Sequence, residues 1–286
     1  MYYLLVMSVL LASFNSIILK ESGAIKKETV FKFNFLSSLV WCVLLFFSNT
    51  CTLHINSQVI FWGVLYGVAQ TGFLWFKTAA MGTGSVSVTT LIGNSSLLIS
   101  LFVSLILWKE SVTSNDIAGL ILLGISIFLC TYRKSDKQYT PGWKYYVVFF
   151  LLFAASVGII FKGFGKSGNI EYCGDMMLFS AIIMLFGNFV VTLITKEGSL
   201  VISDKKRKRN FLLSAVGSGF LSCLYNRLNI FLAGSIDAII FFPGFNGGVV
   251  LLSTFLSVIL LKEKLLILQK IGLFIGAISI CVIGIL

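Results

Sequence analysis

Polar side chains that could bind a small molecule lie inside long apolar runs of this sequence. Within residues 211–233, small and polar residues recur every three or four positions, and three other runs share this rhythm. Such spacing places them on one face of a helix, and a polar face inside a membrane must meet protein or water. The four stripes are Ser8, Ala12 and Asn15; Gly63, Gly67, Gln70, Leu74 and Lys77; Ser87, Thr90 and Asn94; and Ala215, Gly219, Ser222, Asn226, Asn229 and Ala233.

These stripes have two interpretations, and the sequence leaves both open. Small residues let membrane helices pack closely, and amides can bond across the interface between them. Alternatively, the amides of four helices that converge in one bundle line a cavity and hydrogen-bond a substrate.

Arg227 and two aromatic residues extend the list of candidates. A guanidinium cannot lose its charge, so Arg227 either binds a carboxylate of the substrate, pairs with Asp237, or extends to the membrane surface. Trp75 and Tyr225 either stack on a planar substrate or an amine, or simply pack in the bundle. The predicted substrate-binding residues are Asn15, Gln70, Trp75, Asn94, Tyr225, Asn226, Arg227 and Asn229.

The sequence lacks the residue patterns of most enzymes. It has no paired nucleophile and base, no cluster of metal ligands and no phosphate-binding loop, so we expect no enzymatic activity, no cofactor and no metal. The acidic residues lie near the ends of the apolar runs, so no buried carboxylate stands out as a proton carrier. The pairs Lys109–Glu110 and Lys262–Glu263 are predicted in tight surface turns.

The composition is that of an all-α membrane protein. Of 286 residues, 57% are hydrophobic and 12% are charged, against roughly 45–50% and 25% in soluble domains. A membrane helix needs about 20 apolar residues, which predicts ten transmembrane helices. Their expected ranges are 2–19, 30–48, 58–79, 85–107, 116–132, 144–162, 174–195, 211–233, 236–260 and 265–286.

The net charge of +11 reflects basic residues that lie between the apolar runs, as topology signals do, so no nucleic-acid partner is expected. With Lys77 and Arg227 set aside, because they lie inside expected helices, nearly all of the basic residues fall on one side of the membrane; the exceptions are Lys109, Lys162 and Lys166. Since basic loops stay in the cytoplasm, both termini are predicted to be extracellular.

An internal repeat divides the chain in two. Residues 98–130 align without a gap with residues 251–283, an offset of 153, and the matches include Lys109/Lys262, Glu110/Glu263 and Gly119/Gly272. We predict one five-helix repeat over 1–137 and a second over 138–286, in one membrane domain. Because five is an odd number, the second repeat enters the membrane from the opposite side, as in many secondary transporters.

Several motifs carry a resemblance to a known family. "LWKES" followed by "IAGLILLG", and "LLKEK" followed by "KIGLFIGA", place a Glu and then a Gly-rich helix after the fourth and ninth helices, and "FNSIILK" supplies Asn15 and Lys20. The chain thus resembles the EamA-like, ten-helix proteins of the drug/metabolite transporter superfamily over essentially its whole length. Leu97 and Val250 stand where the family often has Pro, so "IGNSS" and "PGFNGG" are expected to loosen those helices instead.

The resemblance implies a secondary transporter that moves a small organic metabolite, such as an amino acid or amine, by alternating access through a central cavity. We also expect a multi-pass protein of the plasma membrane, in contact with the lipid bilayer, as a monomer or homodimer. Many relatives keep their termini in the cytoplasm, so the orientation stays open. A lipid-head-group flippase and a membrane scaffold without a transport cycle are the alternatives.

Labelling from one side of the membrane tests the predicted orientation. A cysteine at Lys208, introduced into a variant that lacks the six native cysteines, should not react in intact cells with a membrane-impermeant thiol reagent, because the basic 205–209 segment is expected in the cytoplasm. It should react after the cells are permeabilised. Reaction in intact cells would show that the protein has the opposite orientation to the predicted one.

Overall fold

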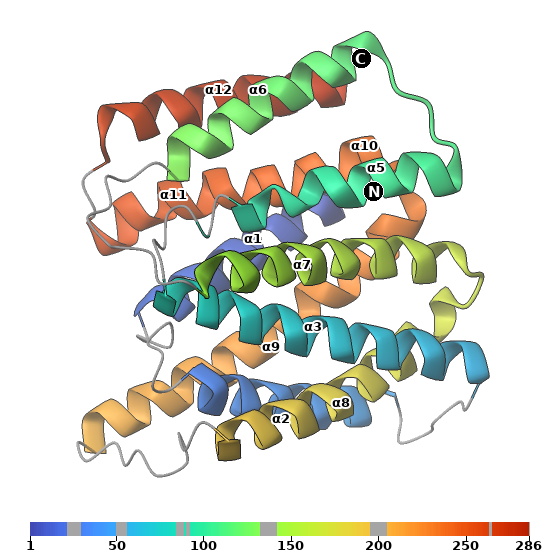
Figure 1. Cartoon of the computed structure of the whole chain (residues 1–286), viewed down its shortest axis with the longest axis vertical. Helices are drawn as coiled ribbons and strands as arrows, with labels where there is room; N and C mark the ends of the chain where they lie inside the picture. The colour runs from blue at the N-terminus through green and yellow to red at the C-terminus, as the bar shows by residue number, and fades with distance from the viewer. Residues whose placement is uncertain are drawn as a thin grey trace.

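The computed structural model describes residues 1–21, 30–49, 56–83, 89, 92–131, 142–194, 205–262 and 265–285. All regular structure within these ranges is helical (Figure 1). The longer helices are α1 (Tyr2–Glu21), α2 (Val30–Ser48), α3 (Ser57–Thr83), α5 (Ser96–Trp108), α6 (Ser114–Thr131), α7 (Trp143–Lys166), α8 (Cys173–Ile194), α9 (Lys205–Ser235), α11 (Gly248–Leu261) and α12 (Ile267–Ile285). The short ones are η1 (Ile170–Tyr172), α10 (Ala238–Phe242) and η3 (Pro243–Gly247).

Seven helical segments among the described residues are long and apolar enough to cross a membrane, which identifies an all-helical membrane protein. Two shorter apolar helices, Ile92–Trp108 and Ile267–Ile283, accompany them. The 31-residue α9 is outside both sets, because the basic residues at its start and Asn226, Arg227 and Asn229 lower its mean hydropathy. The seven segments are Tyr2–Leu19, Phe31–Ser48, Ser57–Met81, Ser114–Thr131, Trp143–Lys166, Ile170–Ile194 and Ala238–Leu260.

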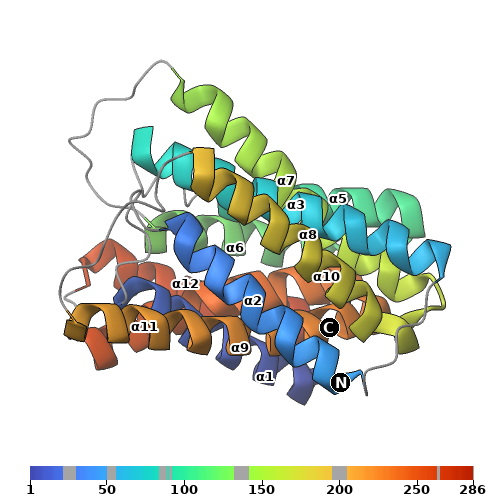
Figure 2. The ribbon, with the colours of Figure 1, turned by 90° about the horizontal axis from the view of Figure 1, so that it is seen from below.

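Both termini lie at the same end of the bundle (Figures 1 and 2). We call this end the terminal face; the turns that join α5 to α6, α7 to α8 and α9 to α10 also lie there (Figure 1). Helices α2, α7, α9 and α12 begin at the opposite end (Figure 1). Their first turns carry Lys32, Lys144, Lys208 and Lys270, so these basic side chains gather away from the termini.

The helices pack in pairs that link the two ends of the sequence. α6 packs along α12, α3 packs against α7 and α8, and α9 packs against α1 and α2. α2 also contacts α8, α5 contacts α7, and α11 contacts α1. Residues 1–137 and 138–286 are therefore interleaved rather than placed side by side.

Two helices end in the same unusual backbone conformation. Lys109 follows α5 with a φ of 52°, and Lys262 follows α11 with a φ of 54°. Within the described ranges these are the two residues other than glycine with a positive φ. A left-handed residue after the last helical turn is a common way to stop a helix, so both turns begin where the Lys-Glu pairs predict.

Two predicted helices are interrupted. Residues 236–260, expected as one helix, form α10, the π-helical η3 and α11. Pro243 lies at the first position of η3, where its missing N–H cannot continue the regular ladder. The 92–108 segment has a turn at Ser95. The motifs "PGFNGG" and "IGNSS" thus loosen their helices as expected.

Two differences between the predicted and the observed helix boundaries concern basic residues. The sixth predicted helix was expected to end at Lys162, but α7 continues to Lys166, so Lys162 lies one turn inside the helix and not at its end. α9 begins at Lys205, so the basic 205–209 segment belongs to a helix. Ser87 and Thr90, from the third stripe, lie outside the described residues.

Glycines allow α7 and α9 to come very close together. A Cβ atom on Gly165 would lie 2.5 Å from the Cα of Gly234 and 2.9 Å from the carbonyl oxygen of Ile230. Both distances are too short for non-bonded atoms, and both partners are backbone. The crossing of α7 and α9 therefore requires glycine at position 165.

Gly165→Ala should lower the melting temperature of the purified protein, because overpacking at a close contact costs about 1–3 kcal/mol. Gly124→Ala is the matched control, since a Cβ there meets nothing within 4 Å. Equal melting temperatures for both variants, measured in the same detergent, would contradict the close crossing.

Candidate functional site

The inward faces of α1 and α9 meet through polar side chains. Ser8 Oγ donates a hydrogen bond to Asn229 Oδ1 at 2.6 Å, and both residues are buried. One turn earlier on α9, Asn226 Nδ2 donates to the carbonyl oxygen of Ser222 at 2.7 Å. The stripes predicted on these two helices therefore face each other.

Tyr225 joins this contact. Its hydroxyl lies beside the side chains of Asn15 and Asn226, and its ring lies 6.2 Å from that of Phe245. Asn15, Tyr225, Asn226 and Asn229 are thus brought together between α1 and α9.

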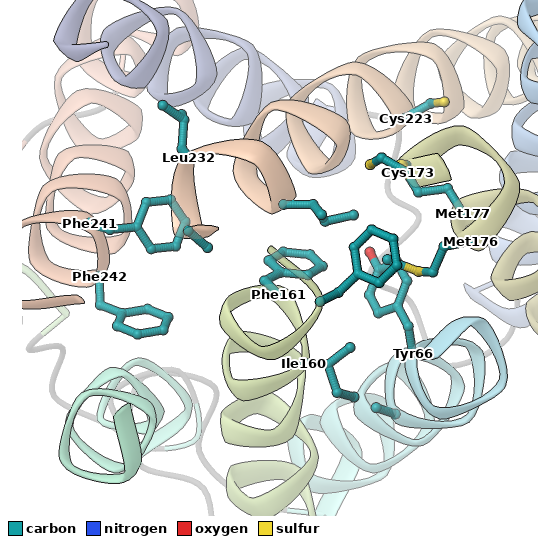
Figure 3. Close-up of a cluster of buried hydrophobic side chains, with 14 of the residues drawn as sticks. Tyr66, Ile160, Phe161, Cys173, Met176, Met177, Cys223, Leu232, Phe241 and Phe242 are labelled. Carbon is teal, nitrogen blue, oxygen red and sulfur yellow. The ribbon is translucent and has the colours of Figure 1, made fainter. Parts of the chain in front are cut away.

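Tyr66 is a member of the same region that the sequence analysis missed. It is fully buried, and its hydroxyl lies near Tyr225 and the thiols of Cys173 and Cys223. Its ring packs against Phe161 with centroids 5.1 Å apart (Figure 3). It falls outside the predicted stripe of α3, although it lies one turn from Gln70. We call Ser8, Asn15, Tyr66, Tyr225, Asn226 and Asn229 the polar cluster.

The polar cluster contains hydrogen-bonding capacity that the protein does not use. Asn15 Oδ1, Tyr66 Oη and Asn229 Nδ2 are buried and have no hydrogen-bond partner in the protein. A buried polar group left without a partner costs about 1–3 kcal/mol, and folded proteins contain few of them. A polar ligand or water placed among these atoms of α1, α3 and α9 would gain hydrogen bonds. Ser13, Asn34, Ser104 and Asn188, elsewhere in the bundle, also carry an unpaired buried atom.

The other predicted site residues lie elsewhere. Trp75 is 45% exposed and stacks on Phe76. Arg227 is exposed, and its guanidinium approaches Ser48 Oγ at 3.4 Å rather than Asp237. Gln70 is half-buried on α3.

Asn94 lies at a different contact, in a cleft of about 40 Å³ with Leu120 and Leu123 of α6. That volume is too small for an organic metabolite. A larger cleft of about 150 Å³ lies between α1, α12 and the α10–η3 segment, and its lining is mainly apolar. Among the described residues, no group of three or more His, Cys, Asp or Glu side chains gathers as metal ligands would.

A buried ion pair lies at the terminal face. Lys162 Nζ is 2.5 Å from Glu110 Oε1; the lysine side chain is 0% exposed and the glutamate side chain 9%. Lys162 also donates to the carbonyl oxygen of Ile236 at 2.9 Å. The predicted turn after α5 is present, but the side chains of Glu110 and Lys162 are buried and paired, because hydropathy alone cannot show that a charge has a partner across the bundle.

Four aromatic residues and a leucine form a packed region that includes the neighbour of Lys162 in sequence, Phe161, and contacts Tyr66 of the polar cluster. Phe161 and Phe164 of α7 and Phe241 and Phe242 of α10 are all buried, as is Leu232 of α9, and they belong to one continuous core with Tyr66 (Figure 3). We call these five residues the aromatic plug.

Comparison with known proteins establishes the fold and no more. No family model and no curated protein matches the chain. A solved structure described only as "Crystal structure of protein" matches with a TM-score of 0.72 at 14% sequence identity, over 99% of this chain and 96% of that chain. The whole helical arrangement therefore has a counterpart of known structure.

Two substitutions test the unused hydrogen-bonding capacity. Tyr66→Phe removes only the hydroxyl and should leave the melting temperature unchanged or higher, because it removes an unpaired buried group. Ser8→Ala should lower the stability by about 1 kcal/mol, because it breaks a buried hydrogen bond. Thermal melting of both purified variants makes the comparison. A loss in Tyr66→Phe as large as that in Ser8→Ala would mean that the hydroxyl already has a partner.

Proposed function

We propose that this protein is a secondary transporter that moves a small organic metabolite, such as an amino acid or amine, across the plasma membrane by alternating access. The observation that carries the proposal is the polar cluster, with three unpaired buried atoms on α1, α3 and α9. A transporter needs such groups, since they bind a substrate while it is shielded from water.

The depth of the polar cluster supports this function. Asn226 lies nine residues before the end of α9 at Ser235, about 14 Å along the helix. That is close to half of the roughly 30 Å hydrocarbon core. Secondary transporters hold their substrate near the membrane midplane, between two repeats.

We further propose ten transmembrane helices in two inverted repeats, 1–137 and 138–286, as in the EamA-like transporters. The offset of 153 supports this, since it relates Lys109 to Lys262, which share a left-handed backbone. The same offset relates the packing of Gly119 on Ile283 to that of Gly272 on Cys130. The same offset makes α9 the counterpart of α3 and α7 the counterpart of α1. The contact between α3 and α7 therefore corresponds to the contact between α9 and α1.

The described arrangement corresponds to one state of this cycle. The aromatic plug and the buried ion pair pack the terminal face, so we infer that this state is closed on that side. If the basic end faces the cytoplasm, this state is closed to the outside and the termini are extracellular.

A ligand screen followed by uptake tests the proposal. The purified protein is melted with amino acids, amines, nucleobases and sugars, and each stabilising compound is tested for uptake into proteoliposomes. Tyr66→Phe should reduce uptake up to about tenfold, because the hydrogen bond from its otherwise unpaired hydroxyl to substrate is lost. Trp75→Ala is the control, since Trp75 lies outside the polar cluster and should leave uptake unchanged.

The absence of any stabilising and transported compound would contradict the transporter. Movement of fluorescent lipids between leaflets in the same proteoliposomes would instead favour a flippase. If neither activity occurs, the membrane scaffold is the remaining function.

A further inference from the structure

Glu110 connects three parts of the terminal face. Its Oε1 pairs with Lys162 of α7, and its Oε2 accepts a hydrogen bond from the backbone N–H of Ala238, at the start of α10, at 2.6 Å. Lys162 in turn binds the carbonyl oxygen of Ile236. One carboxylate in the turn after α5 therefore holds α7 and α10 together.

This connection crosses the boundary between the two proposed repeats. Glu110 belongs to residues 1–137, whereas Lys162, Ile236 and Ala238 belong to residues 138–286. A rocking motion of one repeat against the other at the terminal face has to separate these groups.

The segment that Glu110 holds lies between two irregular points of the backbone. Asp237 has an extended conformation, with φ −60° and ψ 142°, and the π-helical η3 follows at Pro243. Between them, α10 is a five-residue helix that carries Phe241 and Phe242 of the aromatic plug. π-helical turns often occur at functional sites. Movement of α10 would therefore displace the plug.

A permanent seal would not need charges here. Buried ion pairs rarely stabilise a protein more than apolar side chains of similar size, because both ions lose their hydration. When the pair separates into water, however, both ions regain hydration. A buried pair is therefore suited to a contact that forms and breaks repeatedly.

We propose that the Glu110–Lys162 pair is a latch that keeps the terminal face closed and must open for the polar cluster to reach that side. This inference rests on the proposed transport function. It assigns a gating role to two residues that lie outside the substrate-binding set.

Thiol labelling tests the latch without a substrate. The buried residue Leu232 in the aromatic plug is replaced by cysteine in a variant without native cysteines, and a membrane-impermeant reagent is added at the terminal face. Glu110→Gln and Lys162→Met should each raise the labelling rate about tenfold, because the open population increases. Lys166 is an exposed lysine one turn further along α7, and Lys166→Met should leave the labelling rate unchanged.

Two further controls separate gating from loss of structure. A cysteine at Ser126, which is buried between α6 and α12, should label at the same slow rate in every variant. The Glu110→Gln, Lys162→Met double variant should label no faster than the faster single variant, because both changes break one contact. Glu110→Asp replaces Glu110→Gln if that variant does not fold.

Two results would contradict the latch. One is an unchanged labelling rate at position 232 in folded variants. The other is a double variant whose rate increase equals the product of the increases in the two single variants. Such a result together with substrate uptake would leave the transport function intact. Faster labelling without uptake of any compound would support the gate and contradict the proposed transport.

Discussion

A charged lysine that has no access to solvent constrains the terminal half of this bundle. Lys162 is 0% exposed, and an unpaired buried charge would cost several kcal/mol. The fold meets this requirement with Glu110 from the turn after α5 and the carbonyl oxygen of Ile236. That carbonyl is free to accept because α9 ends just before it, and Glu110 also binds the first N–H of α10. One ion pair thus fixes three helix ends.

Some buried polar groups in the interior have hydrogen-bond or ion-pair partners, and others have none. At the terminal face, each charge of the ion pair has a partner. In the polar cluster, Asn15, Tyr66 and Asn229 each retain an unpaired atom, although neighbouring atoms such as Asn229 Oδ1 are well bonded. Binding sites commonly lower the stability of a protein, and these unpaired atoms are the basis on which we propose a substrate near α1, α3 and α9.

The sequence was sufficient for features that depend on local pattern. Hydropathy predicted the all-helical membrane class, the three- and four-residue spacing predicted the buried faces of α1 and α9, and "PGFNGG" predicted the irregular backbone after α10. Periodicity defines a face but not its partner, so it could not show that Lys162 meets Glu110. For the same reason it placed Trp75 and Arg227, which are exposed, with the buried Asn226, and it missed Tyr66.

The central claim is that the polar cluster is exposed to each side of the membrane in turn. The most direct measurement is the labelling of a single cysteine at Asn226 by an impermeant thiol reagent added to either side of oriented proteoliposomes. Alternating access predicts reaction from both sides, with a ratio that saturating substrate changes. Reaction from one side only, or from neither, under all conditions would contradict it.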